Sequence, residues 1–367
     1  MIKRAALILA GGRARRFQSI DKTWQDKALA DLLGKPLLIH AIENVEGVVD
    51  EIVISVNDEV RKEKYTEILK KYSLKKVNLV VDEAVSHLSG PNVAIMSGLK
   101  AVQATYCLTL PCDMPFMQSE VADYLFKEAE GFEVTVPMWP NGRLETLLMV
   151  LKRYVALEIT DNLCSLKRPR SDDIPRGASK LLLVSPVNDI RTIDPELKSF
   201  ININSREDLL RLQTRRSHGP VTENLKLKNG DLAISDLKHL REGAKLMQEG
   251  KFSEAQMTFG LCTRNFEFSN THFWAALSGE NQGEAFLKMS QHQPDPKTAV
   301  ELDFEGKEIF VEAANNYRLE VEKYDENRCR LLAERAWADK AWCESWAMGK
   351  HSHVHRYPSK VPKANLS

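Results

Sequence analysis

The chain has 367 residues, of which 43% are hydrophobic and 28% are charged, and 51 Lys and Arg residues balance 51 Asp and Glu residues. This composition is typical of a globular protein and excludes a chain that is disordered throughout. The length predicts two or three domains. Because no basic excess favours nucleic acid and no apolar run reaches the roughly 20 residues of a membrane span, we expect neither kind of partner.

Cysteine usage bears on the compartment. The six cysteines form no C-x-x-C pair, and the chain is too long to be a small disulfide-stapled domain. We therefore expect a reducing, cytoplasmic location.

Short apolar runs alternate with helix-like stretches through the first 212 residues. The predicted strands are residues 5–9, 51–56, 77–81 and 106–110, and the predicted helices are residues 36–46, 59–72 and 91–103. This alternation predicts βαβ units, and so an α/β, three-layer, Rossmann-like domain with a mostly parallel sheet. Such sheets bind ligands at the carboxyl ends of their strands.

The second half of the chain follows a different pattern. Residues 213–235 are turn-rich and polar, which predicts a linker; residues 236–350 predict an all-helical domain; residues 351–367 predict a flexible tail. The helical part is weakly similar to tetratricopeptide-like repeats, with small residues at expected helix contacts, although no 34-residue period recurs. We expect Trp342 and Trp346 at its surface.

A glycine-rich loop, Leu9-Ala10-Gly11-Gly12, follows the first predicted strand. Its glycines let the backbone approach a ligand closely, and consecutive N–H groups can face phosphate oxygens. A lysine placed after such a loop can neutralise charge as pyrophosphate leaves. On these residues alone, a tight turn with solvated arginines remains the alternative.

Three motifs in this region resemble the opening of the MobA-like nucleotidyltransferases: L-A-G-G-x-x-x-R at 9–16, D-K-A-L at 26–29 and G-K-P-L-L at 34–38. The similarity extends to about residue 212 and implies a nucleotidyltransferase fold. It also implies nucleotide contacts for the glycine-rich loop, and phosphate contacts for Arg16 and Lys27. Because about five extra residues separate Arg16 from the D-K pair, Lys22 remains an alternative to Lys27.

A further motif, L-P-C-D-M-P at 110–115, follows an apolar strand. An acidic residue there can hold Mg²⁺, a cation that prefers oxygen ligands and can bridge nucleotide phosphates. The plain alternative is a cap or turn aspartate. In the family this motif carries the metal-binding aspartate, so the resemblance makes Asp113 a magnesium ligand and, with Lys27 and Arg16, a catalytic residue.

Other polar residues follow strands or open helices. Asn57 and Asp82 would by themselves be interpreted as turn residues, whereas the resemblance assigns both to the nucleotide, together with Gly90. Gly90 opens G-P-N-V-A where the family has G-P-L-A-G, so the second glycine is missing. The motif F-I-N-I-N at 200–204 resembles a family element on the acceptor side of the site. The resemblance makes Asn202 and Asn204 candidates for contact with the acceptor or the metal, although a helix cap also fits Asn204.

Residues 168–180 contain a basic stretch with Arg168, Arg170, Arg176 and Lys180. A phosphorylated pterin would suit this charge, and a solvated loop is the alternative.

The resemblance implies that an acceptor phosphate attacks the α-phosphate of a nucleoside triphosphate and that pyrophosphate leaves. The molybdenum cofactor guanylyltransferases of the family imply GTP as donor, molybdenum-loaded molybdopterin as acceptor and Mg²⁺ as cofactor. Alternatives within the enzyme class are CTP with the same pterin, a cobinamide phosphate or a sugar phosphate; a non-catalytic nucleotide-binding scaffold is the alternative from another class. We further expect the helical domain to be a separable module that docks a molybdoenzyme or another protein.

Overall fold

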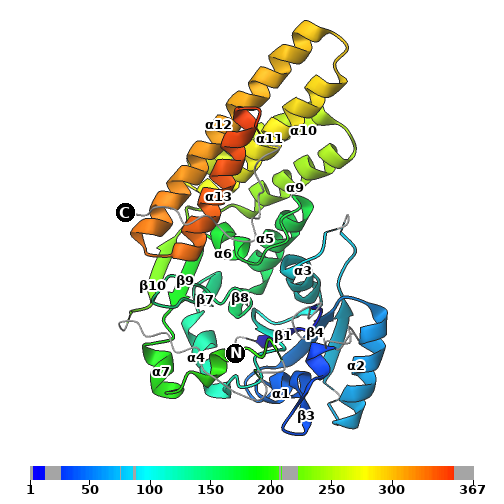
Figure 1. Cartoon of the computed structure of the whole chain (residues 1–367), viewed down its shortest axis with the longest axis vertical. Helices are drawn as coiled ribbons and strands as arrows, with labels where there is room; N and C mark the ends of the chain where they lie inside the picture. Colours follow the sequence, from blue (N-terminus) through cyan, green and yellow to red (C-terminus); the bar gives the residue numbers. More distant parts are fainter. Residues whose placement is uncertain are drawn as a thin grey trace. The chain divides into compact units, whose positions relative to one another are not determined.

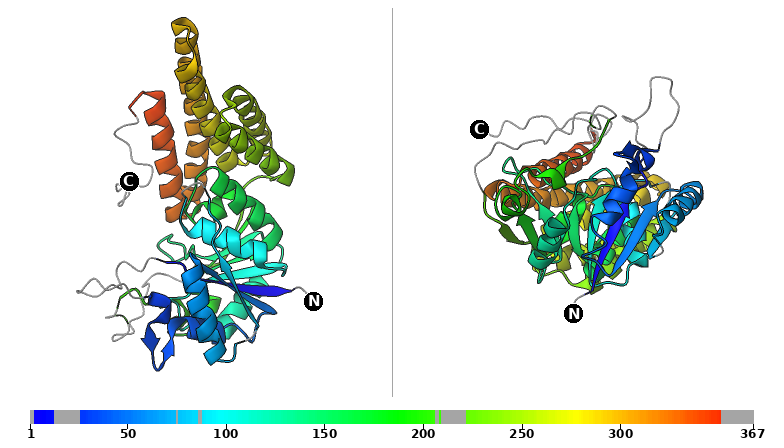
Figure 2. Two further views of the ribbon diagram at one scale, coloured as in Figure 1. Left: turned by 90° about the vertical axis from the view of Figure 1, so that its right-hand side faces the viewer. Right: turned by 90° about the horizontal axis from the view of Figure 1, so that it is seen from below.

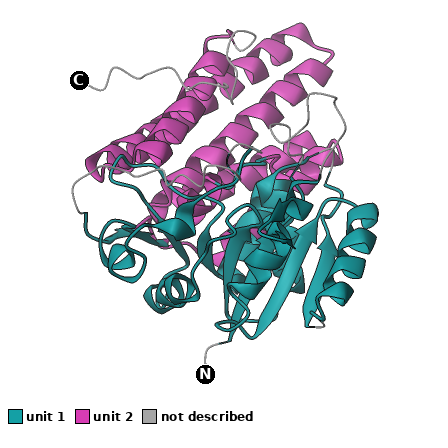
Figure 3. Ribbon diagram, turned by 60° about the horizontal axis from the view of Figure 1, so that its bottom comes forward, with its two compact units in different colours: residues 1–164, 168–171, 180–227 teal, residues 165–167, 172–179, 228–367 magenta. Residues whose placement is uncertain are grey.

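The computed structural model describes residues 3–12, 26–74, 76–85, 88–205, 208 and 222–350. Arg16, Lys22 and the predicted tail 351–367 lie outside the described residues. The chain forms two compact units, coloured teal and magenta in Figure 3. Unit 1 takes residues 1–164, 168–171 and 180–227, and unit 2 takes residues 165–167, 172–179 and 228–367.

Unit 1 is built on an eight-stranded sheet of order β10-β9-β7-β8-β6-β1-β4-β5 (Figure 1). The strands are β1 (Arg4–Leu9), β4 (Glu51–Val56), β5 (Val77–Val81), β6 (Tyr106–Pro111), β7 (Val134–Pro137), β8 (Met149–Lys152), β9 (Lys180–Val184) and β10 (Leu225–Lys228). Strand β1 pairs in parallel with β4 and β6, as does β4 with β5 and β7 with β9, whereas β8 is antiparallel to both of its neighbours. The predicted mostly parallel sheet is confirmed.

Helices cover both faces of this sheet. They are α1 (Leu37–Glu43), α2 (Glu59–Lys71), α3 (Pro91–Ala101), α4 (Ser119–Glu128), α5 (Arg153–Ser165) and α7 (Asp189–Ile193). Because side chains alternate across a strand, Ala6 and Ile8 of β1 share a core with α1, α2 and α4, whereas Leu7 points the other way, against α3. A Cβ on Gly98 of α3 would overlap the Leu7 side chain, so glycine lets this helix lie close to the sheet. The result is the predicted three-layer arrangement.

Unit 2 contains five long helices: α9 (Ile234–Gln248), α10 (Phe252–Phe268), α11 (His272–His292), α12 (Pro296–Glu326) and α13 (Arg330–Ala347). Each packs against the next, and the turns between them are short, so neighbouring helices run in opposite directions, as α11 and α12 do in Figures 1 and 2. The predicted all-helical region is confirmed. No helix in the described part of the chain is long and apolar enough to cross a bilayer.

Small residues lie at the helix contacts of unit 2, as the sequence suggested. A Cβ on Gly243 would meet the Phe259 ring, and one on Gly283 would meet Phe310. The tryptophans expected at the surface are instead half-buried. Trp346 stacks on Phe310, with ring centroids 5.7 Å apart, and meets Trp342 edge-on. Aromatic packing within the bundle therefore accounts for both residues.

The chain passes between the two units at places other than those we expected. Strand β10 lies inside the range 213–235 that we took for a linker, and Leu227 within it is buried. Its four residues alternate too briefly to predict a strand from sequence. In addition, the short helix α6 (Asp173–Gly177) lies within the expected domain 1–212 but belongs to unit 2.

Candidate active site

The carboxyl ends of four neighbouring parallel strands surround a cavity of about 730 Å³ in unit 1. Its lining includes all the predicted nucleotide-binding residues that the structure describes: Leu9, Ala10, Gly11, Gly12, Lys27, Asn57, Asp82, Gly90 and Asp113. Asn202 and Asn204 are not part of this lining. A second, shallower hollow near Phe116 and His40 contains none of the predicted residues.

Strand register brings these residues to one edge. Leu9 of β1 lies opposite Ser55 of β4 and Pro111 of β6. The ladder continues one residue farther, where Ala10 N–H donates to Ser55 C=O at 3.0 Å and Cys112 N–H donates to Leu9 C=O at 3.2 Å. The glycine-rich loop and the residue after Cys112 therefore leave the sheet side by side.

Gly11 lies where three of these segments converge. A Cβ at this position would lie 3.4 Å from Asp82 Oδ2 and 3.4 Å from the backbone nitrogen of Asn57. Around Gly12, in contrast, a Cβ would meet no described atom within 4 Å. Gly11 therefore fits closely between the strand ends.

Lys27 and Asp113 meet at one end of the cavity. Lys27 Nζ lies 2.5 Å from Asp113 Oδ2 and 3.2 Å from Asn204 Oδ1. The other carboxylate oxygen, Asp113 Oδ1, is buried and has no hydrogen-bond partner among the described residues. A buried acceptor of this kind is costly unless something binds it, and a divalent cation would satisfy it.

The described residues hold no cluster of three or more His, Cys, Asp or Glu side chains suited to a metal. A cation held at Asp113 would need further oxygen ligands, which nucleotide phosphates and water supply in phosphoryl-transfer sites.

Asn204 reaches Lys27 because its segment is bound to the loop that carries Asp113. Ile203 N–H donates to Asp113 C=O at 2.9 Å, and Ile201 and Ile203 are buried beside Leu32 and Leu37. The helix-cap alternative operates one residue later, since Ser205 Oγ accepts the N–H of Asp208 at 3.2 Å. The cap therefore does not occupy the Asn204 amide.

Asn202 lies two residues earlier in the same segment and is half-buried. Among the described hydrogen bonds, the Asn202 side-chain amide makes one, which it donates to Phe200 C=O at 3.5 Å. The structure thus brings one of the two predicted asparagines to Lys27.

A layer of buried polar residues supports the loop and Lys27, and we did not predict it. Asp26 accepts the N–H of Ala28 and caps the single-turn helix η2 (Lys27–Leu29). From helix α2, Arg61 donates to Gly12 C=O at 3.2 Å and lies 3.8 Å from Asp26, and the Tyr65 hydroxyl donates to Asp26. In the sequence, Arg61 and Tyr65 lie in the predicted helix 59–72 and belong to none of the motifs.

Burial changes the ionisation of two groups in the cavity. It raises the pKa of Asp82, although Ser55 Oγ donates a hydrogen bond to this carboxylate and Arg61 lies nearby. It also raises the pKa of the Cys112 thiol to about 12, with the Asp113 charge as the next cause. Cys112 is therefore a neutral thiol near pH 7, which agrees with a site that uses no cysteine nucleophile.

The basic stretch 168–180 is not a solvated loop throughout, because Arg168 and Arg176 are buried, whereas Lys180 is exposed. Segment 168–171 packs instead on the start of α3, where a Cβ on Gly90 would lie 2.6 Å from Pro169 C=O. The Asn92 amide donates to Arg168 C=O at 2.7 Å. Gly90 is thus required for this close backbone approach, and it also lines the cavity.

Comparison with known proteins gives consistent matches for this part of the chain. Residues 6–171 match the family model described as the MobA-like NTP transferase domain. Proteins named probable molybdenum cofactor guanylyltransferase from Methanosarcina acetivorans and Methanosarcina mazei are 36% and 32% identical, over 56% of this chain and 88% of each relative. The crystal structure of molybdopterin-guanine dinucleotide biosynthesis protein A from Archaeoglobus fulgidus is 24% identical and aligns with a TM-score of 0.47, over 56% of this chain and 95% of that one.

Proposed function

Because this chain belongs to the MobA-like nucleotidyltransferases, we propose that it transfers GMP from GTP to molybdenum-loaded molybdopterin and releases pyrophosphate. One observation carries the proposal: Lys27 and Asp113 meet in the cavity, and the buried Oδ1 of Asp113 lacks a partner among the described residues. The guanylyltransferase relatives support the choice of GTP and of the pterin.

The residues of the cavity divide the work of such a transfer. The loop N–H groups of Gly11 and Gly12 would bind phosphate oxygens, as glycine-rich loops after parallel strands do. The ammonium of Lys27 would compensate charge that develops on the departing pyrophosphate. Positioning and electrostatics of this kind account for most catalysis in phosphoryl transfer, so no covalent enzyme intermediate is required.

Mg²⁺ is the cofactor that we propose, held by Asp113. When bound, it would neutralise the phosphate charge that otherwise repels the attacking oxygen. Asp113 can bind a cation while it is paired with Lys27, because Lys27 contacts Oδ2, whereas Oδ1 has no partner among the described residues.

Recognition of the base would fall to the opposite side of the cavity, where Asn57, Asp82 and the start of α3 lie. Ala94 lines this side and occupies the position of the second glycine in the family element G-P-L-A-G. Its methyl group narrows the space for a base, so the nucleotide preference must be measured directly.

The test is pyrophosphate release with Mg²⁺ and GTP, CTP, ATP or UTP in parallel, with and without molybdenum-loaded molybdopterin. Wild type is compared with Asp113→Asn and with Asp123→Asn, a control carboxylate that pairs with Arg4 outside the cavity. We expect release with GTP alone, dependent on the pterin, lost in Asp113→Asn and retained in Asp123→Asn.

Other outcomes would change the proposal in defined ways. Release with CTP would replace the nucleotide, and release only with a sugar phosphate or cobinamide phosphate would replace the acceptor. If no nucleotide gave release and GTP did not bind, the guanylyltransferase proposal would be wrong and the scaffold alternative would be favoured.

A further inference from the structure

Helix α6 is an excursion of the nucleotidyltransferase chain into the helical unit. Residues 172–179 belong to unit 2, although both flanking segments, 168–171 and 180–227, belong to unit 1. Every residue of α6 is buried, including the charged Asp173 and Arg176. Charged side chains are rarely buried completely unless they are paired, so this short helix has specific partners.

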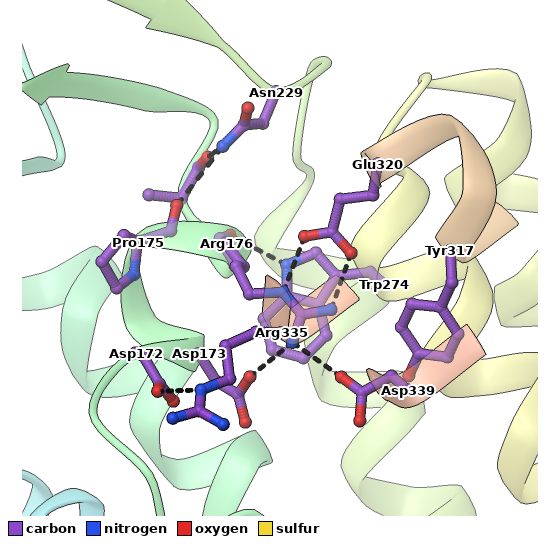
Figure 4. A network of polar contacts seen from close by, with 12 residues as sticks. Asp172, Asp173, Pro175, Arg176, Asn229, Trp274, Tyr317, Glu320, Arg335 and Asp339 are labelled. Carbon is purple, nitrogen blue, oxygen red and sulfur yellow. Dashed lines mark hydrogen bonds and ion pairs between the residues drawn. The ribbon is translucent and has the colours of Figure 1, made fainter. Parts of the chain in front are cut away.

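Arg176 is the centre of a buried ionic network in unit 2 (Figure 4). Its guanidinium makes two parallel hydrogen bonds to Glu320 of α12, each 2.7 Å long. Its Nη1 lies 2.7 Å from Asp173 and 2.7 Å from Asp339 of α13. The guanidinium also lies over the Phe273 ring at 4.5 Å. Such a bidentate, stacked arrangement is specific to arginine.

The backbone of the excursion is bound by the same unit. Trp274 Nε1 donates to Gly177 C=O at 2.8 Å, and the Asn229 amide donates to the carbonyls of Pro175 and Ala178. Three carbonyls at the end of α6 thus have side-chain donors from unit 2, in place of the solvent or cap that a helix end normally needs.

The segment that immediately precedes residues 172–179 packs in unit 1 against the start of α3, where Gly90, Pro91, Val93 and Ala94 line the cavity. Arg168 and Pro169 accept hydrogen bonds from the side chain and the backbone N–H of Asn92, at the start of α3. Ser171 Oγ donates to Thr146 Oγ1, next to the cavity residue Leu147. The next residue, Asp172, already belongs to unit 2, where it accepts a hydrogen bond from Arg335 at 2.6 Å.

We propose that Arg176 is a positioning residue for the nucleotide cavity, and that the helical unit holds the start of α3 in place through the covalently linked segment 168–171. This segment contacts Asn92 through residues 168 and 169 and Thr146 through Ser171, and Ser171 is joined directly to the residues that Arg176 anchors. Loosening the anchor would release the carbonyls that hold Asn92.

Hydrogen–deuterium exchange of the full-length protein tests this without any nucleotide. Arg176→Lys keeps the charge but loses the paired hydrogen bonds, and Glu320→Gln weakens the same pair from the other side. We expect both variants to raise exchange at the amides of residues 92–94 by about 2- to 30-fold, the range of mutations that modulate coupling between distant sites. The Kd for GTP with Mg²⁺ should rise by a similar factor.

Phe259→Leu is the matched control, because Phe259 faces Gly243 where α9 meets α10 and is not among the described partners of Arg176. A general loss of stability in the helical unit would affect both kinds of variant. The proposal therefore requires that Phe259→Leu lower the thermal midpoint as much as Arg176→Lys yet leave the amides of residues 92–94 unchanged. Unchanged exchange in Arg176→Lys, or equal acceleration in Phe259→Leu, would overturn it. Neither result depends on which nucleotide the enzyme uses.

Discussion

The hydroxyl of Tyr65 lies 2.9 Å from Oδ1 and 3.0 Å from Oδ2 of Asp26, the residue that precedes Lys27. Burial is the larger cause that raises the pKa of Tyr65, and the charge of Asp26 is the next. The hydroxyl therefore keeps its proton and donates it in a hydrogen bond to the carboxylate. Asp26 in turn caps the turn that carries Lys27. The position of the proposed catalytic lysine thus depends on a phenol from helix α2.

Replacing Tyr65 by Phe keeps the buried ring and removes the hydroxyl, which donates to Asp26 and, at 3.4 Å, to Ala10 C=O. We expect the free energy of unfolding to fall by about 1.5–3 kcal/mol, the range for hydrogen bonds to charged groups. Pyrophosphate release should slow by about 10-fold, because the reaction rate falls steeply when a catalytic group is displaced. Urea denaturation and steady-state kinetics measure the two effects, with Tyr154→Phe, an exposed tyrosine of α5, as control. A destabilised variant with an unchanged rate would show that Asp26 does not position Lys27.

Lys27→Met and Lys22→Met distinguish the two lysines that the sequence left open. Lys27 contacts Asp113 in the cavity, whereas Lys22 lies outside the described residues. We expect Lys27→Met to lower kcat by about 10²–10³-fold, as the loss of one charge-stabilising donor does, and Lys22→Met to lie within a fewfold of wild type. The reverse order of the two variants would assign the phosphate contact to Lys22.

The sequence predicted the sheet and the location of the cavity because both depend on local patterns. Apolar, β-branched runs at 51–56 and 77–81 coincide with β4 and β5, and the rule that ligands bind at carboxyl strand ends pointed to Asn57 and Asp82. The family motifs added Lys27 and Asp113. These residues lie together in the structure although 86 positions separate the last two.

Long-range burial of charge could not be predicted in the same way. Arg176 looked like part of a solvated basic loop, and its partners Glu320 and Asp339 lie 144 and 163 positions away. The burial of Arg61 could not be predicted for a similar reason, since a charged residue on a charged helix is normally exposed. Sequence periodicity reports which face of a helix is apolar, not which charge finds a partner from another element.

The burial of the Asp82 carboxylate should make the stability difference between Asp82→Asn and wild type depend on pH. Because the native pKa is raised, the folded state binds the proton more tightly than the unfolded state, whose Asp pKa is about 3.9. Stability contributed by Asp82 therefore falls as pH rises above about 4. The asparagine variant cannot ionise, so we expect it to be more stable than wild type at pH 7, with a gain that shrinks toward pH 4. Its affinity for GTP should nevertheless fall.

Asp123→Asn should change the stability with the opposite pH dependence. Hydrogen bonds from Lys127 and Arg4 lower the pKa of Asp123, so its stabilising contribution is present above about pH 4 and is lost as pH falls through the native pKa. We expect this variant to be less stable than wild type at pH 7 and equal to it in acid. Thermal unfolding of both variants between pH 3 and pH 8 measures the two trends, and parallel curves would contradict the assignment for Asp82.

Separating the helical unit from the rest of the chain provides the most direct test of the excursion. A polypeptide of residues 228–350 lacks α6, so Glu320 and Asp339 would lose the guanidinium that they face. Removing one partner of a buried ion pair costs about 3–5 kcal/mol, and we expect this fragment to unfold at a much lower urea concentration than the helices of the full chain. A synthetic peptide of residues 168–180 should raise the midpoint, whereas the same peptide with Arg176→Met should not. A fragment that is stable alone and indifferent to both peptides would restore the view of the helical part as a separable module.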